Sequence, residues 1–356
     1  MNKVNIEQIG AKEAENIQNN DMSNNIILVQ NGLAYKDVKE IALDVYRNEA
    51  SNFSKESAEE VKKRVEEFVD DYLTVVFNDT PDIVERLKKP SMQHALFNAE
   101  KGYALDETQT TKAYYIEMLK HRLKAEDKTI LQIGLDEAIK SMEKITKEQM
   151  DCLTFMFLIF NFPHNIDSIS AVIRYCNYLC DFYHSSFNSK LNVISLRAIN
   201  ACTSLDGTKK YIPIQEWLRK VTAGIFYKGQ DKEEIVKRLQ IDSIEEINII
   251  LMKNLLDPTK FQINAINLDT LKFLISKHHL EFCEDKLIQM FNEKIMNETE
   301  IKDKLIEWEP RMKEVLEFWE KEDLKYSTLT PSGIIIAISN YNNKKNETIS
   351  FEKYIN

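Results

Sequence analysis

SAEEVKKRVEEFVDDYLTVV, residues 57–76, decides the fold class of this chain. Its apolar residues recur every three or four positions for about five turns, which places them on one face of an amphipathic helix. Ser57 and Glu60 have the spacing of a capping box and predict where this helix begins. The apolar stripe consists of Ala58, Val61, Val65, Phe68, Val69, Tyr72, Leu73 and Val76.

Helical patterns of this kind continue along the chain, whereas residues that form turns are scarce. Residues 35–50 carry a similar stripe and are expected to pair with residues 57–76 as an αα-hairpin. Gly 8 and Pro 7 together make up 15 of 356 residues, about 4%, where about 12% is usual. A chain with so few turn formers does not readily build many short strands. We therefore predict a mainly α fold, a multi-helix array of αα-hairpins with a short β-prone segment at the N-terminus.

Changes of composition along the chain divide it into four parts. The strongest internal break is SLDGTKKYIP, residues 204–213, which combines Asp-Gly, a basic pair and a proline. Pro310 either kinks one helix or separates two. The predicted parts are a polar, β-prone segment 1–32, a first helical lobe 33–203, a second helical lobe 204–325, and a helical tail 326–356 that packs on the body.

Two further helices are predicted from capping boxes, in which a side chain at the N-cap and one three residues later satisfy each other's backbone donors. The first box opens an apolar helix that ends near Pro163, and the second opens a helix over residues 245–256. These boxes are Thr146 with Gln149, and Ser243 with Glu246.

The N-terminal segment differs from the helical body and is the first candidate functional element. It is rich in Asn and contains the β-prone pieces VNIEQIG and NIILVQNG. Asn and Gln side chains form ladders when identical strands stack, so this segment is predicted to assemble copies of the chain. The alternative is a disordered or loosely docked arm. The residues assigned to assembly are Ile6, Gln8, Ile17, Gln18, Ile26, Ile27, Leu28 and Val29.

A second hypothesis is a metal site made from two Cys–His pairs. Cys180 and His184 are four residues apart on one predicted helix, and His279 and Cys283 repeat the spacing on another. If these helices packed together, the four side chains could ligate zinc, which would suit a metal-dependent hydrolase or nuclease. Cys176 precedes Cys180 by one turn. The alternative is that these cysteines pack in the core as small apolar side chains.

The known catalytic motifs are absent from the sequence, and no cofactor is predicted apart from the zinc of this alternative. There is no G-x-S-x-G, Walker A, G-x-G-x-x-G, H-E-x-x-H or C-x-x-C pattern. We therefore assign no catalytic residues. A non-enzymatic role is the preferred interpretation, and a helical enzyme stays open.

Charge and cysteine content limit the partners and the compartment. The formal net charge is −10, which disfavours a nucleic-acid partner, because neutralising phosphates requires clustered positive charge. A nucleic-acid-binding regulator is the second alternative. The longest apolar run, residues 153–160, is too short to span a bilayer. The polar N-terminus and the odd number of cysteines predict a cytoplasmic protein. These are Cys152, Cys176, Cys180, Cys202 and Cys283.

Residues 31–73, NGLAYKDVKEIALDVYRNEASNFSKESAEEVKKRVEEFVDDYL, carry a resemblance to a known family. The stretch is similar to the signature of uncharacterised bacterial proteins in which an Asn/Gln-rich N-terminal stretch precedes a GLxYxxVKxIALDV helix. Looser similarity follows at residues 95–104, 130–139 and in the tail. The N-terminal stretch keeps Asn-Ile-Gln at 16–18 but lacks a second glycine, which weakens an assembly role taken from the family. The matching positions are Gly32, Leu33, Tyr35, Val38, Ile41, Ala42, Leu43, Asp44 and Val45.

The resemblance implies a bacterial protein from variable gene sets, including ones linked to mobile elements or phage defence, and implies no activity. Together with the residues, it predicts a non-catalytic interaction, sensor or scaffold protein. We expect it to oligomerise through residues 1–32 and to bind a protein partner through its helical body.

Overall fold

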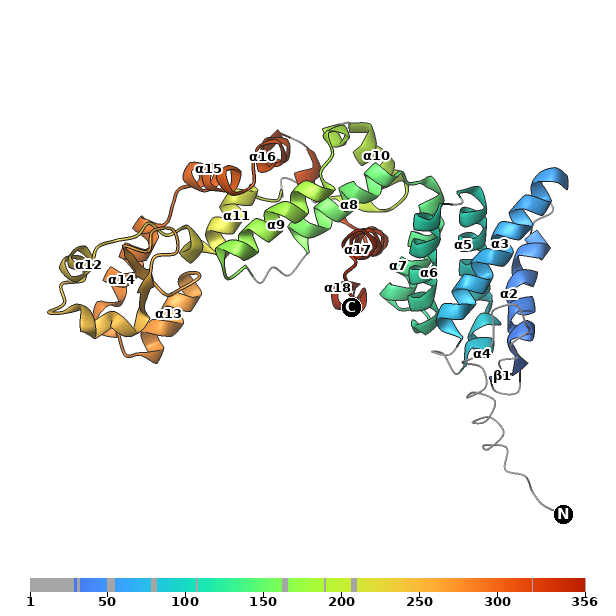
Figure 1. Ribbon diagram of the computed structural model, residues 1–356, viewed down its shortest axis with the longest axis horizontal. Coiled ribbons are helices and arrows are strands. Elements are labelled where there is room, and N and C mark those ends of the chain that lie inside the picture. Colours follow the sequence, from blue (N-terminus) through green and yellow to red (C-terminus); the bar gives the residue numbers. More distant parts are fainter. Residues whose placement is uncertain are drawn as a thin grey trace, which may run out of the picture. The chain divides into compact units, whose positions relative to one another are not determined.

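The computed structural model contains helices over most of its length and only short antiparallel strands (Figure 1). Helices account for 73% of the structure, so the predicted mainly α fold is confirmed. The described residues are 29–30, 33–49, 55–77, 82–106, 108–161, 166–188, 190–205, 210–321 and 323–355. Within them, no helix has both the length and the apolar composition that crossing a membrane requires.

The chain forms two compact units, Met1–Asp127 and Lys128–Asn356. This boundary differs from the break expected at residues 204–213, which lies inside the second unit. The reason is a long-range strand pair that joins Cys202–Ser204 to Ser327–Leu329 and ties both sides of that break together. The elements of the first unit are β1 Val29–Gln30, β2 Leu33–Ala34, α2 Tyr35–Glu49, α3 Lys55–Val76, α4 Ile83–Leu87, α5 Pro90–Leu105 and α6 Gln109–Lys124.

Helix α3 organises the first unit, because α2, α5 and α6 all pack on it. Its apolar stripe is buried from Val61 to Val76, as the spacing predicts. The helix begins at Lys55, so Ser57 lies within the first turn and is not the cap. Phe68 stacks on Tyr103 of α5, with ring centroids 5.4 Å apart. Lys112 of α6 is buried against α3 and bonds Glu67 at 2.5 Å and Asp71 at 2.8 Å.

The second unit contains two groups of elements, the first around a long C-terminal helix and the second around residues 223–295. The helices are α7 Ile130–Ser141, η2 Met142–Lys144, α8 Lys147–Phe160, α9 Ile169–Phe182, η3 Ser185–Asn188, α10 Lys190–Ala198, α11 Ile214–Val221, η4 Ala223–Phe226, α12 Lys232–Leu239, η5 Ile244–Ile250, α13 Leu268–Lys277, η6 Glu281–Cys283, α14 Glu284–Lys294, α15 Glu298–Trp308, α16 Met312–Lys321, η7 Asp323–Tyr326, α17 Pro331–Lys345 and α18 Glu352–Ile355. The strands are β3 Cys202–Ser204, β4 Leu251–Lys253, β5 Phe261–Ile263 and β6 Ser327–Leu329.

The two predicted capping boxes are present, but only the first opens an α-helix. Thr146 and Gln149 cap α8 as expected. Ser243 and Glu246 also form a capping box, yet it opens the 3₁₀ helix η5, which ends at Ile250. The predicted helix over residues 245–256 is therefore wrong, because its second half is strand β4, paired antiparallel with β5.

A buried polar network explains why the chain leaves the helix at this point. Asn254 donates from Nδ2 to the carbonyl oxygen of Tyr227 and to Oε1 of Gln262, both at 2.8 Å. Its own Oδ1 accepts from the backbone N–H of Asp257, which closes the turn after β4. Gln262 donates to the carbonyl oxygen of Gly224 at 2.9 Å. Tertiary hydrogen bonds that no local pattern reveals thus hold the β4–β5 hairpin on the loop before α12.

Glu100 on α5 is a carboxyl group buried inside the first unit. Its side chain is fully buried, and neither carboxyl oxygen has a hydrogen-bond partner among the described residues. Burial raises the pKa of Glu100 well above its usual value, because a charge without a partner is costly in an apolar surrounding. Burial therefore favours the protonated form of this carboxyl group in the folded protein.

The first prediction is that Glu100→Gln stabilises the first unit in a pH-dependent way. Below the pKa of the unfolded chain both states are protonated, so the gain in stability from the substitution should be smallest near pH 4. As the pH rises, the natural chain loses stability by about 1.4 kcal/mol per pH unit until the folded carboxyl group ionises. Hydrogen exchange of α3 and α5 amides at pH 4 and pH 7 measures the difference. Equal protection of the two chains at pH 7 would contradict the assignment.

Candidate functional site

Helix α17 positions the most elaborate polar cluster of the second unit. Thr330 is its N-cap and accepts from the backbone N–H of Gly333, and Pro331 occupies the first helical position. Pro at that position loses no hydrogen bond and has the helical φ already. The helix makes its most extensive contacts with α8 and α7 and is buried continuously from Ser332 to Asn342.

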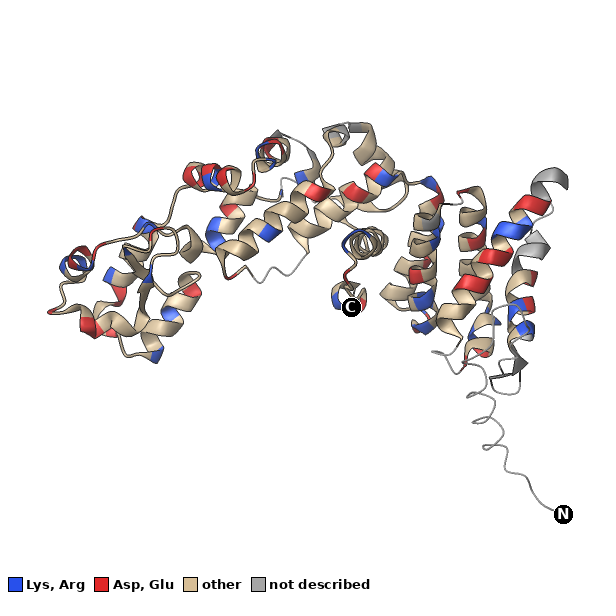
Figure 2. Cartoon of the chain, viewed as in Figure 1, with Lys and Arg blue, Asp and Glu red and all other residues tan. Residues whose placement is uncertain are grey.

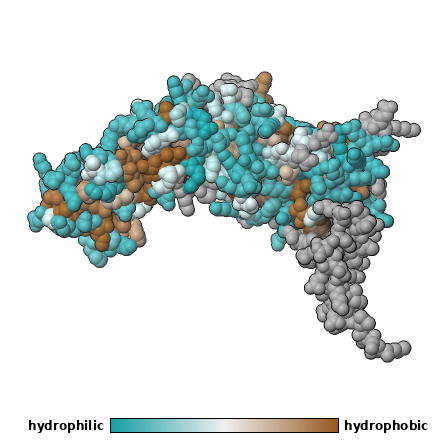
Figure 3. All heavy atoms as spheres, viewed as in Figure 1, coloured by the Kyte–Doolittle hydropathy of each residue, from teal (hydrophilic) through white to brown (hydrophobic). Residues whose placement is uncertain are grey.

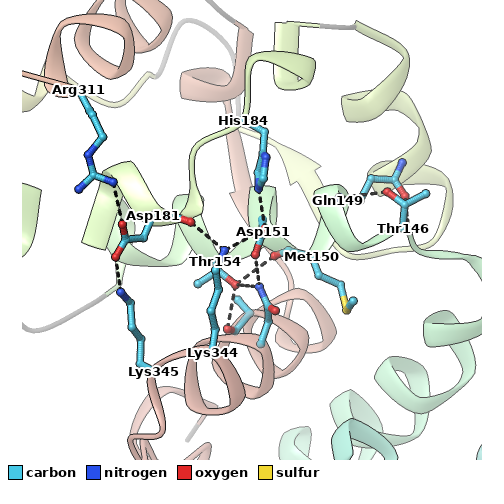
Figure 4. Close-up of polar contacts among 12 residues, drawn as sticks. Thr146, Gln149, Met150, Asp151, Thr154, Asp181, His184, Arg311, Lys344 and Lys345 are labelled. Carbon is cyan, nitrogen blue, oxygen red and sulfur yellow. Dashed lines mark hydrogen bonds and ion pairs between the residues drawn. The ribbon is translucent and has the colours of Figure 1, made fainter. Parts of the chain in front are cut away.

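At the centre of the cluster lies Asp151 of α8, whose side chain is 2% exposed (Figure 4). Asn340 of α17 donates from Nδ2 to Oδ1 of Asp151 at 2.8 Å. Lys344, one turn further along α17, donates to Oδ2 at 3.2 Å. His184, just after α9, bonds the same Oδ2 through Nε2 at 2.7 Å. The buried carboxylate therefore has partners from α17 and from the end of α9, as a buried charge requires.

Thr154 extends the cluster by one turn of α8. Its hydroxyl accepts from Nδ2 of Asn340 at 2.9 Å. The same hydroxyl lies 3.0 Å from the carbonyl oxygen of Met150 and 3.1 Å from that of Ala337, either of which accepts its proton. The amide of Asn340 is thus held between two polar groups on one face of α8. This arrangement fixes the register of α17 against α8.

A second ion pair cluster lies beside the first, at the end of α9. Asp181 receives hydrogen bonds from Lys345 of α17 and from Arg311, which bonds Oδ1 at 2.9 Å. Lys344 also donates to the backbone carbonyl oxygen of Asp181 at 2.8 Å. Burial raises the pKa of Asp181, but the bonds to Lys345 and Arg311 outweigh this and hold the pKa below its usual value. Arg311 also pairs with Glu309, which precedes α16.

Chemically, this polar cluster is suited to hold helices together. We call the set Asp151, Thr154, Asp181, His184, Arg311, Asn340, Lys344 and Lys345 the α17 clamp. One pair within it also has the geometry of a proton-transfer site, because a buried carboxylate orients a histidine that is partly open to solvent. The side chain of His184 is 40% exposed.

An apolar groove lies at the opposite end of α17, where that helix begins. It has a volume of about 370 Å³ and lies between α7 and the start of α17. Ile130 and Ile133 of α7 line it and are 60% and 54% exposed. Gly134 lets the helices approach closely, because a Cβ there would lie 3.1 Å from Cβ of Pro331. The full lining is Ile130, Ile133, Gly134, Glu137, Asn200, Thr330, Pro331 and Ser332.

The residues of the zinc hypothesis occupy different surroundings, and two of them are not helical as expected. Helix α9 carries Cys180 but ends at Phe182, so His184 lies beyond it and bonds Asp151. Helix α13 ends at Lys277, and His279 follows it with a φ of 56° in the left-handed region. The prediction that each Cys–His pair lies on a single helix is therefore wrong.

The cysteines of this hypothesis behave as core residues. Cys283 belongs to the apolar cluster of residues 223–295. Burial raises the pKa of Cys180 to about 12 and raises that of Cys283, so neither thiol is poised to form the thiolate that binds metals. Among the described residues, no group of three or more His, Cys, Asp and Glu side chains has an arrangement that could hold a metal ion. The structure does not bring the four residues together as one site.

Of the residues assigned to assembly, only Val29 is within the described part of the chain. It pairs with Ala34 in the β1–β2 hairpin. Ile6, Gln8, Ile17, Gln18, Ile26, Ile27 and Leu28 lie outside the described residues, so their role stays a prediction.

The residues of the clamp and the groove were not found from the sequence. Asp151 is the one acidic residue in the middle of an otherwise apolar stretch of α8, and Asn340 interrupts the apolar face of α17. A polar residue inside an apolar helix indicates a buried hydrogen bond, and this signal could have found the pair. Ile130 and Ile133 carry no comparable signal, because they read as ordinary core positions.

Comparison with protein families matches the chain to a family without a characterised function. Its family model matches residues 32–355. The chain belongs to this family. The match begins at Gly32, so the Asn-rich segment before it is outside the matched range. Searches of curated proteins and of solved structures found no significant match.

The second prediction concerns the anchoring of α17. Asn340→Leu removes the donor to Asp151 and should destabilise the second unit by about 1.5–3 kcal/mol, the range for hydrogen bonds to charged groups. Tryptophan fluorescence during urea unfolding measures this selectively, because Trp217, Trp308 and Trp319 all lie in the second unit.

Asn343→Leu is the matched control for this measurement. Asn343 is on the same helix but is exposed, and its side chain donates to the carbonyl oxygen of Ser339. Its replacement should change the stability by less than about 0.5 kcal/mol. An equal effect of the two substitutions would show that the bond to Asp151 is not what holds α17.

Proposed function

We propose that this protein is a non-catalytic interaction or scaffold protein of bacteria. It assembles through its N-terminal segment, residues 1–32, and binds protein through the α7–α17 groove of its helical body. The observation that carries this proposal is the groove itself, an apolar recess whose largest side chains, Ile130 and Ile133, face solvent. A link to phage defence or mobile elements stays a prediction from the family resemblance.

The composition of the groove favours a protein partner with apolar side chains. Covering an isoleucine that is now exposed gains up to roughly 1.5–3 kcal/mol, depending on how much of it becomes buried. The groove volume of about 370 Å³ is at the low end of the roughly 300–1,000 Å³ of small-molecule pockets. It therefore accommodates a few side chains of a bound segment.

Other large apolar residues are also exposed on the described surface. Ile249, Phe273 and Phe282 are each more than half exposed and belong to the group of elements around residues 223–295. Figure 3 shows hydrophobic areas on this part of the molecule. We assign them no partner.

The charge distribution supports a protein partner over nucleic acid. Lys and Arg are interspersed with Asp and Glu along the described helices (Figure 2). Many of the basic side chains are paired, as Lys112 is with Glu67 and Asp71. Neutralising a phosphate backbone requires unpaired, clustered positive charge.

A hydrolase is the second candidate function, and one observation favours it. His184 is partly exposed and is oriented by the buried carboxylate of Asp151, which is the arrangement of a general base. If this pair performs chemistry, the purified chain should hydrolyse one of a panel of nucleotides, nucleic acids and peptides, and His184→Ala should abolish that turnover.

The third prediction tests the scaffold directly by the mass in solution. The full chain should show the mass of an oligomer in light scattering, and a chain lacking residues 1–28 should show that of a monomer. The truncation stops at Leu28 because β1 begins at Val29. Equal unfolding temperatures of the two chains would establish that the helical body is intact. A full chain that is monomeric at concentrations up to about 100 µM would contradict the proposal, because self-association would then be weaker than about 5.5 kcal/mol.

A further inference from the structure

The α7–α17 groove and the N-terminal segment are complementary in chemistry. The groove is mainly apolar, with Glu137 as the acidic residue of its lining. Near the start of the chain, Val4 and Ile6 are two residues apart, and Lys3 precedes them. In an extended segment, residues two apart point to the same side. Bound in an extended form, Val4 and Ile6 would present two apolar side chains together, and Lys3 would supply a cation for Glu137.

Val4 and Ile6 are chosen over residues closer to β1 because a longer stretch of chain separates them from that strand. Ile26, Ile27 and Leu28 precede Val29 of β1 directly and are tethered beside it. Ile6 is more than twenty residues further from β1. At about 3.3 Å per extended residue, Ile6 has a reach on the order of 70 Å. Ile6 can therefore reach surfaces that Ile26, Ile27 and Leu28, which directly precede β1, cannot reach.

We infer that the extended segment around Val4 and Ile6 of one copy occupies the α7–α17 groove of a second copy. Val4 and Ile6 cover Ile130 and Ile133, and Lys3 pairs with Glu137. Exchanging an arm between identical chains is a low-cost route to assembly, because one contact is repeated in every copy. This inference rests on the proposed function, since it names the site that receives the assembly segment.

Directed disulfide cross-linking tests this contact. A chain carrying Ile6→Cys is mixed with a chain carrying Ile133→Cys under mild oxidation. The five native cysteines are buried, so the introduced thiols react first. The expected product is a covalent dimer that contains one chain of each kind. The control replaces Ile133→Cys by Ile249→Cys, which changes an isoleucine of similar exposure outside the groove. This control should give less than about a tenth of the product.

Replacement of the same groove residue by arginine provides the second measurement. Ile133→Arg should weaken self-association at least about tenfold, which corresponds to about 1.4 kcal/mol, and Ile249→Arg should leave it unchanged. Because Ile133 is 54% exposed, the substitution should not affect folding, and tryptophan fluorescence of the second unit verifies this.

The outcomes separate this inference from the proposed function. If deleting residues 1–28 abolishes the oligomer but neither Ile133 variant has an effect, the scaffold proposal holds and the groove is not the receptor. If Ile6→Cys and Ile133→Cys cross-link only when both are placed in one chain, the arm docks on its own body, and exchange between copies is overturned. If the full chain is monomeric, both the proposed function and the inference fail.

Discussion

The second unit depends on one buried negative charge, the carboxylate of Asp151. An isolated carboxylate in a protein interior costs several kcal/mol, so a fold that buries one must supply partners. Here they come from α17, through Asn340 and Lys344, and from His184 after α9. Because Asp151 lies on α8, a shift of α17 by one residue would remove the donors Asn340 and Lys344 and leave the charge with His184 alone. Apolar packing alone tolerates such shifts more readily than a hydrogen-bond network does.

The sequence predicts elements well where one local signal decides them. Thr146 and Gln149 satisfy each other within one turn, so the start of α8 is visible without any knowledge of the fold. Pro310 falls between α15 and α16, as a residue without a backbone donor should. Ser243 and Glu246 form their box too, but the chain beyond Ile250 pairs with β5 instead of continuing as a helix. That choice depends on residues such as Gln262, which lie far along the sequence.

The candidate site could not be predicted to the same extent, because its parts meet only in three dimensions. Asp151 and Asn340 are 189 residues apart, and neither belongs to a recognisable motif. Helical spacing suggested that Cys180 and His184 form a ligand pair on one helix. Helix α9 ends between them, however, and His184 bonds Asp151 instead. Predictions from helical spacing were correct for residues inside one helix and wrong for the residue beyond its end. A histidine after a helix is free to take a partner from another element.

Helix α17 connects the α17 clamp and the α7–α17 groove, the two features on which the proposed functions rest. Its C-terminal half supplies Asn340 and Lys344 to the clamp, and its first residues form one wall of the groove with α7. A helix moves as a rigid unit over its 15 residues. The clamp therefore sets the position of Pro331 against Ile133, and with it the width of the groove. The proposed scaffold function requires a groove of constant shape, and the buried ion pair at one end of α17 supports that shape at the other end.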